Sequence, residues 1–336
     1  DGDYTFSRAL VPGTYDVTVT PSDLSRLPPL VRRGFELTTP ERENSPQQLA
    51  LRYESLSEVS GSIVDADTGL PVAGLAVRAV DPARDGALVS TVATTDAYGA
   101  FRLLLSPGAR TRPWSLQLSS SPRVTDTTAP DWRLTYEVTH ASLGVPATGT
   151  MLAPVRVPRA MAFTRDDTGG CAACLELEAT VEGQSPDGAS VGVAAAALDF
   201  HADDVLGTLA SGHRAWFDLR AVSQTDGTVR ARVLAGTYRT LVTPPDAMRF
   251  AITSVELPLR GVGPYRGRVL ALRRPVAVTG RVTDAARSNG MANATIEAVP
   301  LRSVLDTLVP APSPAMRLAR PARTLTDAMG RYALQL

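Results

Sequence analysis

The two cysteines of this 336-residue chain, Cys171 and Cys174, have the spacing that most directly suggests chemistry. A Cys-x-x-Cys pair can act as a redox couple or supply half of a metal site. Residue 175 is Leu rather than His, which excludes the usual motif for covalent haem attachment, and there is no second cysteine pair to complete a zinc ribbon. We therefore predict a short-loop disulfide between Cys171 and Cys174, which suits an oxidising compartment.

Other segments match fragments of catalytic or metal-binding motifs. Gly188-Ala-Ser190-Val-Gly192 has the spelling of a nucleophile elbow, but the sequence around it is strand-like, whereas an elbow lies between a strand and a helix. His201 and His213 are twelve residues apart, which is wrong for a zinc finger, and His201-Ala-Asp203-Asp204 is typical of a solvated loop. No His is followed by Glu three positions on, as a metallocarboxypeptidase would require. We predict no catalytic residue, metal site or cofactor.

Composition excludes further classes of function. The 34 basic residues are all Arg and are balanced by 34 Asp and Glu. Without Lys the chain can form neither a Schiff base, nor a P-loop, nor a Lys–Asn isopeptide bond. Zero net charge gives no field that would attract nucleic acid or an anionic membrane. The apolar run Val191–Leu198 is far shorter than the roughly 20 residues that span a bilayer.

The elements that would position any site are revealed by internal repeats. Val59-Ser-Gly61-Ser-Ile63-Val-Asp65-Ala66 matches Val278-Thr-Gly280-Arg-Val282-Thr-Asp284-Ala285 at an offset of 219 residues. Thr95-Asp96-Ala-Tyr-Gly99-Ala-Phe101 matches Thr326-Asp327-Ala-Met-Gly330-Arg-Tyr332 at an offset of 231. The same unit therefore occurs at least twice, and the later copy carries twelve extra residues.

A second signature links two other places. Gly13-Thr-Tyr15-Asp-Val-Thr-Val19-Thr-Pro21 matches Gly236-Thr-Tyr238-Arg-Thr-Leu-Val242-Thr-Pro244. Within these segments apolar residues alternate with polar ones, which predicts strands with one buried face. In the first signature, the Asp-x-x-Gly element that precedes Phe101 and Tyr332 suits a tight turn. Short strands at regular spacing predict an all-β sandwich.

Together these motifs resemble the carboxypeptidase regulatory-like domain. The resemblance rests on the strand–Gly–strand–Asp start, the Thr68-Gly69-Leu-Pro71 turn, the Thr-Asp-x-x-Gly-x-Phe element and the final Gly-x-Tyr strand. It implies tandem transthyretin-like or Ig-like β-sandwiches, the first and last of them incomplete. We place the last part of one unit and a linker at 1–57, whole units at 58–165 and 166–275, and the first part of a fourth at 276–336. The chain then reads as a piece of a longer polypeptide.

The residues expected to matter are therefore folding residues. Glycines and an aspartate or aromatic near each are predicted to hold the turns and strand starts: Gly13, Tyr15, Gly61, Asp96, Gly99, Phe101, Gly236, Tyr238, Gly280, Asp327, Gly330 and Tyr332. Gly61, Gly99, Gly280 and Gly330 should need positive φ or a close backbone approach. Trp114, Trp132 and Trp216 could stack on sugars but are expected in the core or its rim, and Arg230, Arg232 and Arg239 are expected on solvated faces.

The expected function follows from the repeats and the missing chemistry. We predict a non-enzymatic structural array at the cell surface, in the periplasm or outside the cell. One alternative is an adhesion module that binds cell-envelope polysaccharide or another surface protein through its inter-strand loops. Another is a set of accessory domains in a larger secreted peptidase or transport receptor, whose working part would lie outside this chain.

Overall fold

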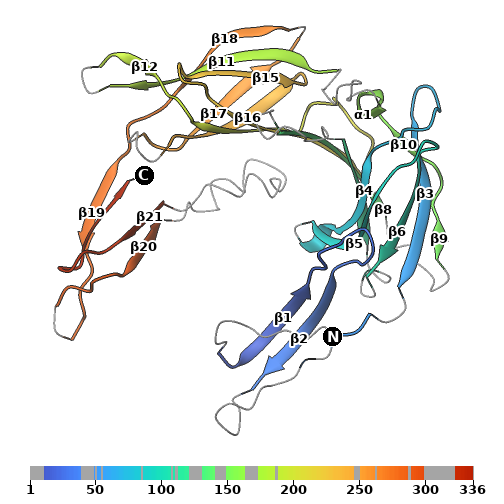
Figure 1. The fold of residues 1–336 in the computed structure, drawn as a ribbon, viewed down its shortest axis with the longest axis horizontal. Coiled ribbons are helices and arrows are strands. Elements are labelled where there is room, and N and C mark those ends of the chain that lie inside the picture. Colours follow the sequence, from blue (N-terminus) through green and yellow to red (C-terminus); the bar gives the residue numbers. More distant parts are fainter. Residues whose placement is uncertain are drawn as a thin grey trace. The chain divides into compact units, whose positions relative to one another are not determined.

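The computed structural model is built almost wholly of β-strands, which confirms the predicted all-β fold class (Figure 1). It describes residues 11–38, 49, 51–53, 56–84, 86–106, 109, 113–120, 131–140, 149–162, 173–185, 188–245, 250–261, 263–286, 289–298 and 322–335. The chain divides into two compact units, one of residues 1–120, 135–162 and 210–214, the other of residues 121–134, 163–209 and 215–336. The four-unit division predicted from the repeats stays a prediction.

The elements fall into four groups along the chain. An N-terminal hairpin consists of β1 (Gly13–Val19) and β2 (Leu30–Leu37). The first sandwich comprises β3 (Ser57–Asp65), β4 (Ala76–Asp81), η1 (Pro82–Arg84), β5 (Ala87–Thr94), β6 (Ala100–Leu105), β7 (Trp114–Ser120), β8 (Asp131–His140), β9 (Thr150–Met151) and β10 (Val155–Val157). The helix α1 (Arg159–Ala162) follows, and then the second sandwich: β11 (Leu175–Gln184), β12 (Ser190–Gly192), β13 (Ala197–Ala202), β14 (His213–Val222), β15 (Thr228–Val233), β16 (Gly236–Thr243), β17 (Thr253–Leu259) and β18 (Tyr265–Ala271). A C-terminal half-sandwich contains β19 (Ala277–Arg281), β20 (Thr295–Ala298), β21 (Ala322–Leu325) and β22 (Arg331–Gln335).

The two sandwiches share one strand plan. In the first, β3 pairs antiparallel with β6 and parallel with β9 and β10, while β4 pairs with β5 and β7. In the second, β11 pairs antiparallel with β15 and parallel with β18, while β13 pairs with β14 and β16. In the first sandwich β5 pairs with both β6 and β4 and so links the two sets of strands, whereas β11 and β13 of the second lie in different sheets. Alternate apolar side chains of these strands are buried.

A repeated hydrogen-bond network ties the first strand of each unit to a glycine turn and to the segment that follows that strand. In the first sandwich the Ile63 amide donates to Gly99 O (2.8 Å), and the Val72 amide donates to Ile63 O (3.0 Å). In the second, Val181 donates to Gly227 O (2.9 Å) and receives the amide of Val193 (2.9 Å). The half-sandwich repeats both bonds, from Val282 to Gly330 O (2.8 Å) and from Met291 to Val282 O (3.0 Å). These residues are the ones that the sequence offsets of 219 and 231 make equivalent to Ile63, Gly99 and Val72.

In two of the copies, the carboxylate of a single aspartate closes the Asp-x-x-Gly turn. Asp96 Oδ1 accepts the amides of Tyr98 (2.9 Å) and Ala100 (2.8 Å). Asp327 Oδ1 accepts those of Met329 and Arg331, both at 2.8 Å. These bonds place the following glycine, Gly99 or Gly330, at positive φ (69° and 74°). The Asp-x-x-Gly motif therefore acts as the tight turn that its residue types suggest.

Two other glycines are required for a different reason. Gly61 lies opposite Phe101 on the neighbouring strand, and a Cβ at this position would be 3.0 Å from the Phe101 ring. Gly280 lies opposite Tyr332, where a Cβ would be 2.6 Å from ring atom Cζ. Neither glycine has positive φ. Of the two reasons for a glycine that the sequence suggested, positive φ and close backbone approach, only the close approach applies at these two positions. The aromatic ring covers the backbone of the strand beside it.

Candidate functional site

The structure separates the residues that the sequence flagged for chemistry. Ser190, in the elbow-like segment, lies on β12 and donates from Oγ to Glu182 Oε2 (2.6 Å). His201 Nδ1 lies 2.7 Å from Asp218 Oδ1, and His213 Nδ1 lies 2.5 Å from the Tyr136 hydroxyl. Each group thus has its own partner, and the three do not form a Ser–His–acid arrangement. Burial raises the pKa of Tyr136, which keeps its hydroxyl protonated.

The structure also bears on the cysteine pair, on metal binding and on membrane-spanning helices. Cys174 is buried and disulfide-bonded, while Cys171, its predicted partner, lies outside the described residues. In the part of the chain that the structure describes, no group of three or more His, Cys, Asp and Glu is placed to hold a metal ion. No described helix is long and apolar enough to cross a membrane.

Two of the three tryptophans fill the interior rather than a sugar-binding face. Trp114 and Trp132 are 1% and 5% exposed, and Trp132 stacks on Phe217 with ring centroids 6.0 Å apart. Trp216 is half-buried on β14. Two stacking platforms that an adhesion module could use are therefore part of the packing.

Two tyrosines anchor the hairpins in which the sequence placed them. The Tyr238 hydroxyl donates to Leu234 O at 2.8 Å, four residues earlier in the chain. Tyr15 makes the equivalent bond to Val11 O. Tyr238 is fully buried, and desolvation, followed by the nearby Asp204 carboxylate, raises its pKa strongly. Such a bond fixes the turn that starts the strand to the strand itself.

A row of polar side-chain pairs lies between β7 and β8 and was not found in the sequence. Ser115 pairs with Thr139 (3.3 Å), and Gln117 Nε2 donates to Glu137 Oε2 (2.7 Å). Arg78 on β4 continues the row by donating to Gln117 Oε1 (3.0 Å). Glu137 is 5% exposed, so these bonds satisfy a carboxylate that would otherwise be costly to bury.

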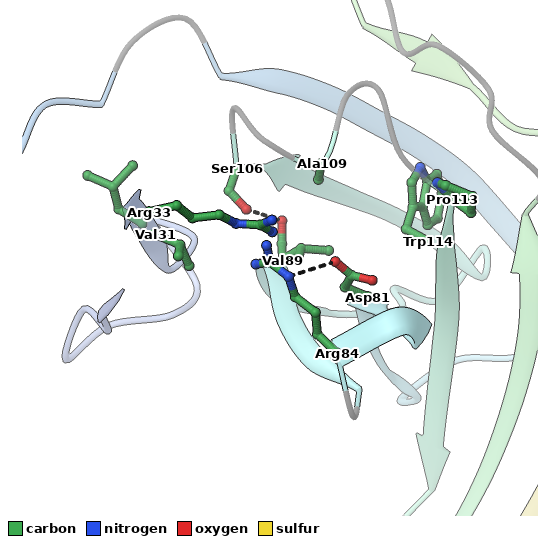
Figure 2. A pocket seen from close by; sticks show the side chains of 10 residues that line it. Val31, Arg33, Asp81, Arg84, Val89, Ser106, Ala109, Pro113 and Trp114 are labelled. Atoms are coloured by element: carbon green, nitrogen blue, oxygen red, sulfur yellow. Dashed lines mark hydrogen bonds and ion pairs between the residues drawn. The ribbon is translucent and has the colours of Figure 1, made fainter. Parts of the chain in front are cut away.

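A hollow on the first unit lies where the N-terminal hairpin meets the first sandwich (Figure 2). Apolar and polar side chains line it: Leu30, Val31, Arg33, Asp81, Arg84, Val89, Ser106, Ala109, Pro113 and Trp114. Figure 2 shows the Arg33 and Arg84 guanidinium groups pointing toward the same space beside Val89. Arg84 forms an ion pair with Asp81 (3.5 Å).

The charge of this hollow favours an anion. Among the described residues no carboxylate pairs with Arg33, so the two arginines outnumber the one acid. Ser106 is held by its bond to Val89 O (2.7 Å) at the same wall. A planar guanidinium pair beside an apolar wall can hold a carboxylate by two parallel hydrogen bonds. The sequence offered no signal for it, because Arg33 lies on β2 and Arg84 on η1, two elements that only folding brings together.

Comparison with known proteins identifies no family. No family model and no curated protein matches the chain. Solved structures that resemble it include the Bacillus anthracis TIE protein (11% identity, TM-score 0.22, covering 84% of this chain), of which the chain spans only 44%. They also include a streptococcal ancillary pilin (12% identity, TM-score 0.28, 79% of this chain and 76% of that one). The shaft pilin SpaA from Lactobacillus rhamnosus GG matches at 11% identity and a TM-score of 0.21, over 65% of this chain and 98% of that one.

These scores are too low to transfer a fold or a function to this chain. The all-β class rests on the strands of the structure itself, and the resemblance to carboxypeptidase regulatory-like domains stays a prediction.

Proposed function

We propose that the chain is a structural array of tandem β-sandwich units that acts as a spacer or scaffold outside the cytoplasm. The observation that supports it best is the network repeated at Ile63, Val181 and Val282, which uses the same bonds each time. The units thus repeat the hydrogen bonds that hold their fold, whereas the residues flagged for chemistry do not recur from unit to unit. A mechanical or spacing role needs only the repeated fold.

The location is tested by labelling cells of the source organism with an antibody against this chain. A scaffold outside the cytoplasm predicts that intact cells bind the antibody and that external protease removes the signal. Signal that requires permeabilised cells would contradict the proposal. A cytoplasmic protein loaded and probed in parallel shows that the cells are intact.

A second candidate is a binding module, favoured by the hollow between Arg33 and Arg84. The fitting ligand is a polysaccharide rich in uronic acids, since its carboxylates match the guanidinium pair. Polygalacturonate titrated into the full chain should bind, and Arg33→Ala should weaken binding at least tenfold. Arg32→Ala is the matched control, because Arg32 is the exposed neighbour on the same strand and does not line the hollow. Equal effects of the two substitutions would show that only general surface charge attracts the polymer.

A further inference from the structure

The strand β18 of the second sandwich lies in a segment of one-sided charge. From residue 257 to residue 283 the sequence holds six arginines and no aspartate or glutamate, although the whole chain has equal numbers of basic and acidic residues. Two of these arginines, Arg266 and Arg268, lie on β18 and are exposed. Neither forms a hydrogen bond or an ion pair with any residue that the structure describes. The strand therefore carries positive charge that nothing described beside it balances.

β18 is also an edge strand. In the described part of the chain it pairs with β11 alone, in parallel, as far as Glu182 (Figure 1). The Leu272 amide donates to Glu182 O at 2.7 Å. Because successive residues of a strand direct their N–H and C=O groups to opposite sides, those of Val269 and Ala271 point away from β11. The edge thus presents two backbone donors and two backbone acceptors to a further strand.

The open stretch of this edge has a defined end. Arg273 also directs its backbone away from β11, but there its C=O accepts the Ala251 amide (2.9 Å) and its N–H donates to Thr253 Oγ1 (3.4 Å). Before that point the strand is open, and the side chain of Val269 is 54% exposed. The chain itself therefore covers the edge after Ala271 and leaves the stretch with the two arginines uncovered.

The corresponding edge of the first sandwich is built differently. There β3 pairs in parallel with two short strands, β9 and β10, which Pro154 separates and Pro158 follows. Short strands and prolines are common means of preventing strand addition at an edge. The β18 strand contains no proline and pairs with five residues of β11. Its arginines oppose pairing with a second copy of β18, because like charges would then lie together, and they favour an acidic strand.

We propose that β18 is a docking site for an extended acidic segment of another protein, which adds to this sheet as a further strand. Backbone hydrogen bonds with Val269 and Ala271 would hold the added strand, and its carboxylates would pair with Arg266 and Arg268. This surface goes beyond the proposed array, which needs no partner at this edge.

The charges within the second sandwich favour another protein as the source of that strand. Its own acidic strand, β11, is already matched, because Glu176 lies opposite Arg232 and Glu178 opposite Arg230 on β15. The Glu178 carboxylate forms an ion pair with Arg230 (3.4 Å). The arginines of β18 lie on the other side of β11 and have no such match among the described strands.

The charge contribution is tested by titrating the full chain with a labelled synthetic peptide in which glutamate alternates with threonine, followed by fluorescence anisotropy. We expect saturable binding, which Arg268→Gln should weaken by roughly tenfold. Arg133→Gln is the matched control, because Arg133 is an exposed arginine on a different strand, β8, and it should leave the affinity unchanged. Equal affinities of the two variants would overturn the charge match, and a lack of saturable binding would overturn the docking site.

The backbone contribution is tested separately by Ala271→Pro. Proline removes the N–H that points to the open edge and keeps the bond from Leu272 to Glu182, so the sandwich should remain folded. We expect roughly tenfold weaker binding of the peptide. Ala271→Ser retains the N–H and should bind like the unmodified chain. A peptide of the same sequence with every amide N-methylated makes the same test without altering the protein, and it should not bind.

Two outcomes would assign the edge to something else. Unweakened binding of the N-methylated peptide would show that charge alone attracts it and would overturn strand addition. A mass of the unmodified chain that grows with concentration, and that Arg268→Gln returns to the monomer, would make a second copy the occupant and overturn the choice of another protein. Neither outcome concerns where the array is located, so the proposed function stands or falls by its own test.

Discussion

Gly99 and Gly69 give the sharpest test of the repeated turn network, because they share a backbone conformation and differ in their surroundings. Their φ angles are 69° and 70°. A Cβ added at Gly69 would meet nothing within 4 Å, whereas one at Gly99 would lie 2.3 Å from Ile63 O and 3.1 Å from the Val72 amide nitrogen. Alanine at either position is strained by the left-handed conformation, and only at position 99 must the backbone also move.

The expected magnitudes follow from these two terms. The left-handed strain costs about 1–2 kcal/mol at both positions. Moving Ile63 away from position 99 also weakens two backbone hydrogen bonds, from Ile63 to Gly99 O and from Val72 to Ile63 O, each contributing about 1 kcal/mol net. Gly99→Ala should therefore destabilise the first sandwich by about 3–4 kcal/mol, roughly 2 kcal/mol more than Gly69→Ala.

Hydrogen exchange read by mass spectrometry measures this difference at the bonds themselves. A gap of about 2 kcal/mol corresponds to roughly 30-fold faster exchange of the Ile63 and Val72 amides in Gly99→Ala than in Gly69→Ala. Amides of the second sandwich serve as an internal reference and should exchange alike in both variants. If the two variants lose the same protection, the proposed role of the close approach at Gly99 is refuted.

Three further predictions concern single side chains. Thr240 is fully buried and its Oγ1 has no hydrogen-bond partner in the described structure, so Thr240→Val should raise the stability of the second sandwich by about 1 kcal/mol, measured by urea unfolding; Thr237→Val, which loses a contact with Arg260, should not. Asp96→Ala removes the acceptor of two amides and should destabilise the first sandwich by about 1–2 kcal/mol in the same assay, and an unchanged midpoint would contradict the turn. Burial raises the pKa of Tyr238, so its stabilising contribution is complete below the unfolded value of about 10 and falls by about 1.4 kcal/mol per pH unit above it; Tyr238→Phe should flatten that alkaline loss, and an equally steep loss in the variant would assign it to other groups.

The sequence was sufficient for the elements that repeat. The offsets of 219 and 231 residues aligned Val59 with Val278 and Gly99 with Gly330, and the turn bonds of the structure follow the same equivalences. Asp-x-x-Gly could be read as a turn because both residue types act through their own local backbone. Hairpin signatures are local in the same sense, so the bond from Tyr238 to Leu234 O agrees with the predicted anchor.

What the sequence could not supply depends on contacts between distant strands. Arg33 and Arg84 lie on separate elements, and nothing in their neighbours along the chain indicates that they line one hollow. Gln117 and Glu137 occupy alternate strand positions that ordinarily face solvent, yet both are buried. Their burial follows from the packing of the sheet, which a two-residue period does not encode.

The central claim, a chain of separately folded sandwich units, is tested most directly by pulling single molecules from the two ends. The account predicts at least two separate unfolding events, each releasing roughly 350 Å of chain for a unit of a hundred residues. Gly99→Ala should lower the force of one event and leave the other unchanged. A single event that releases the whole chain at once would contradict the account.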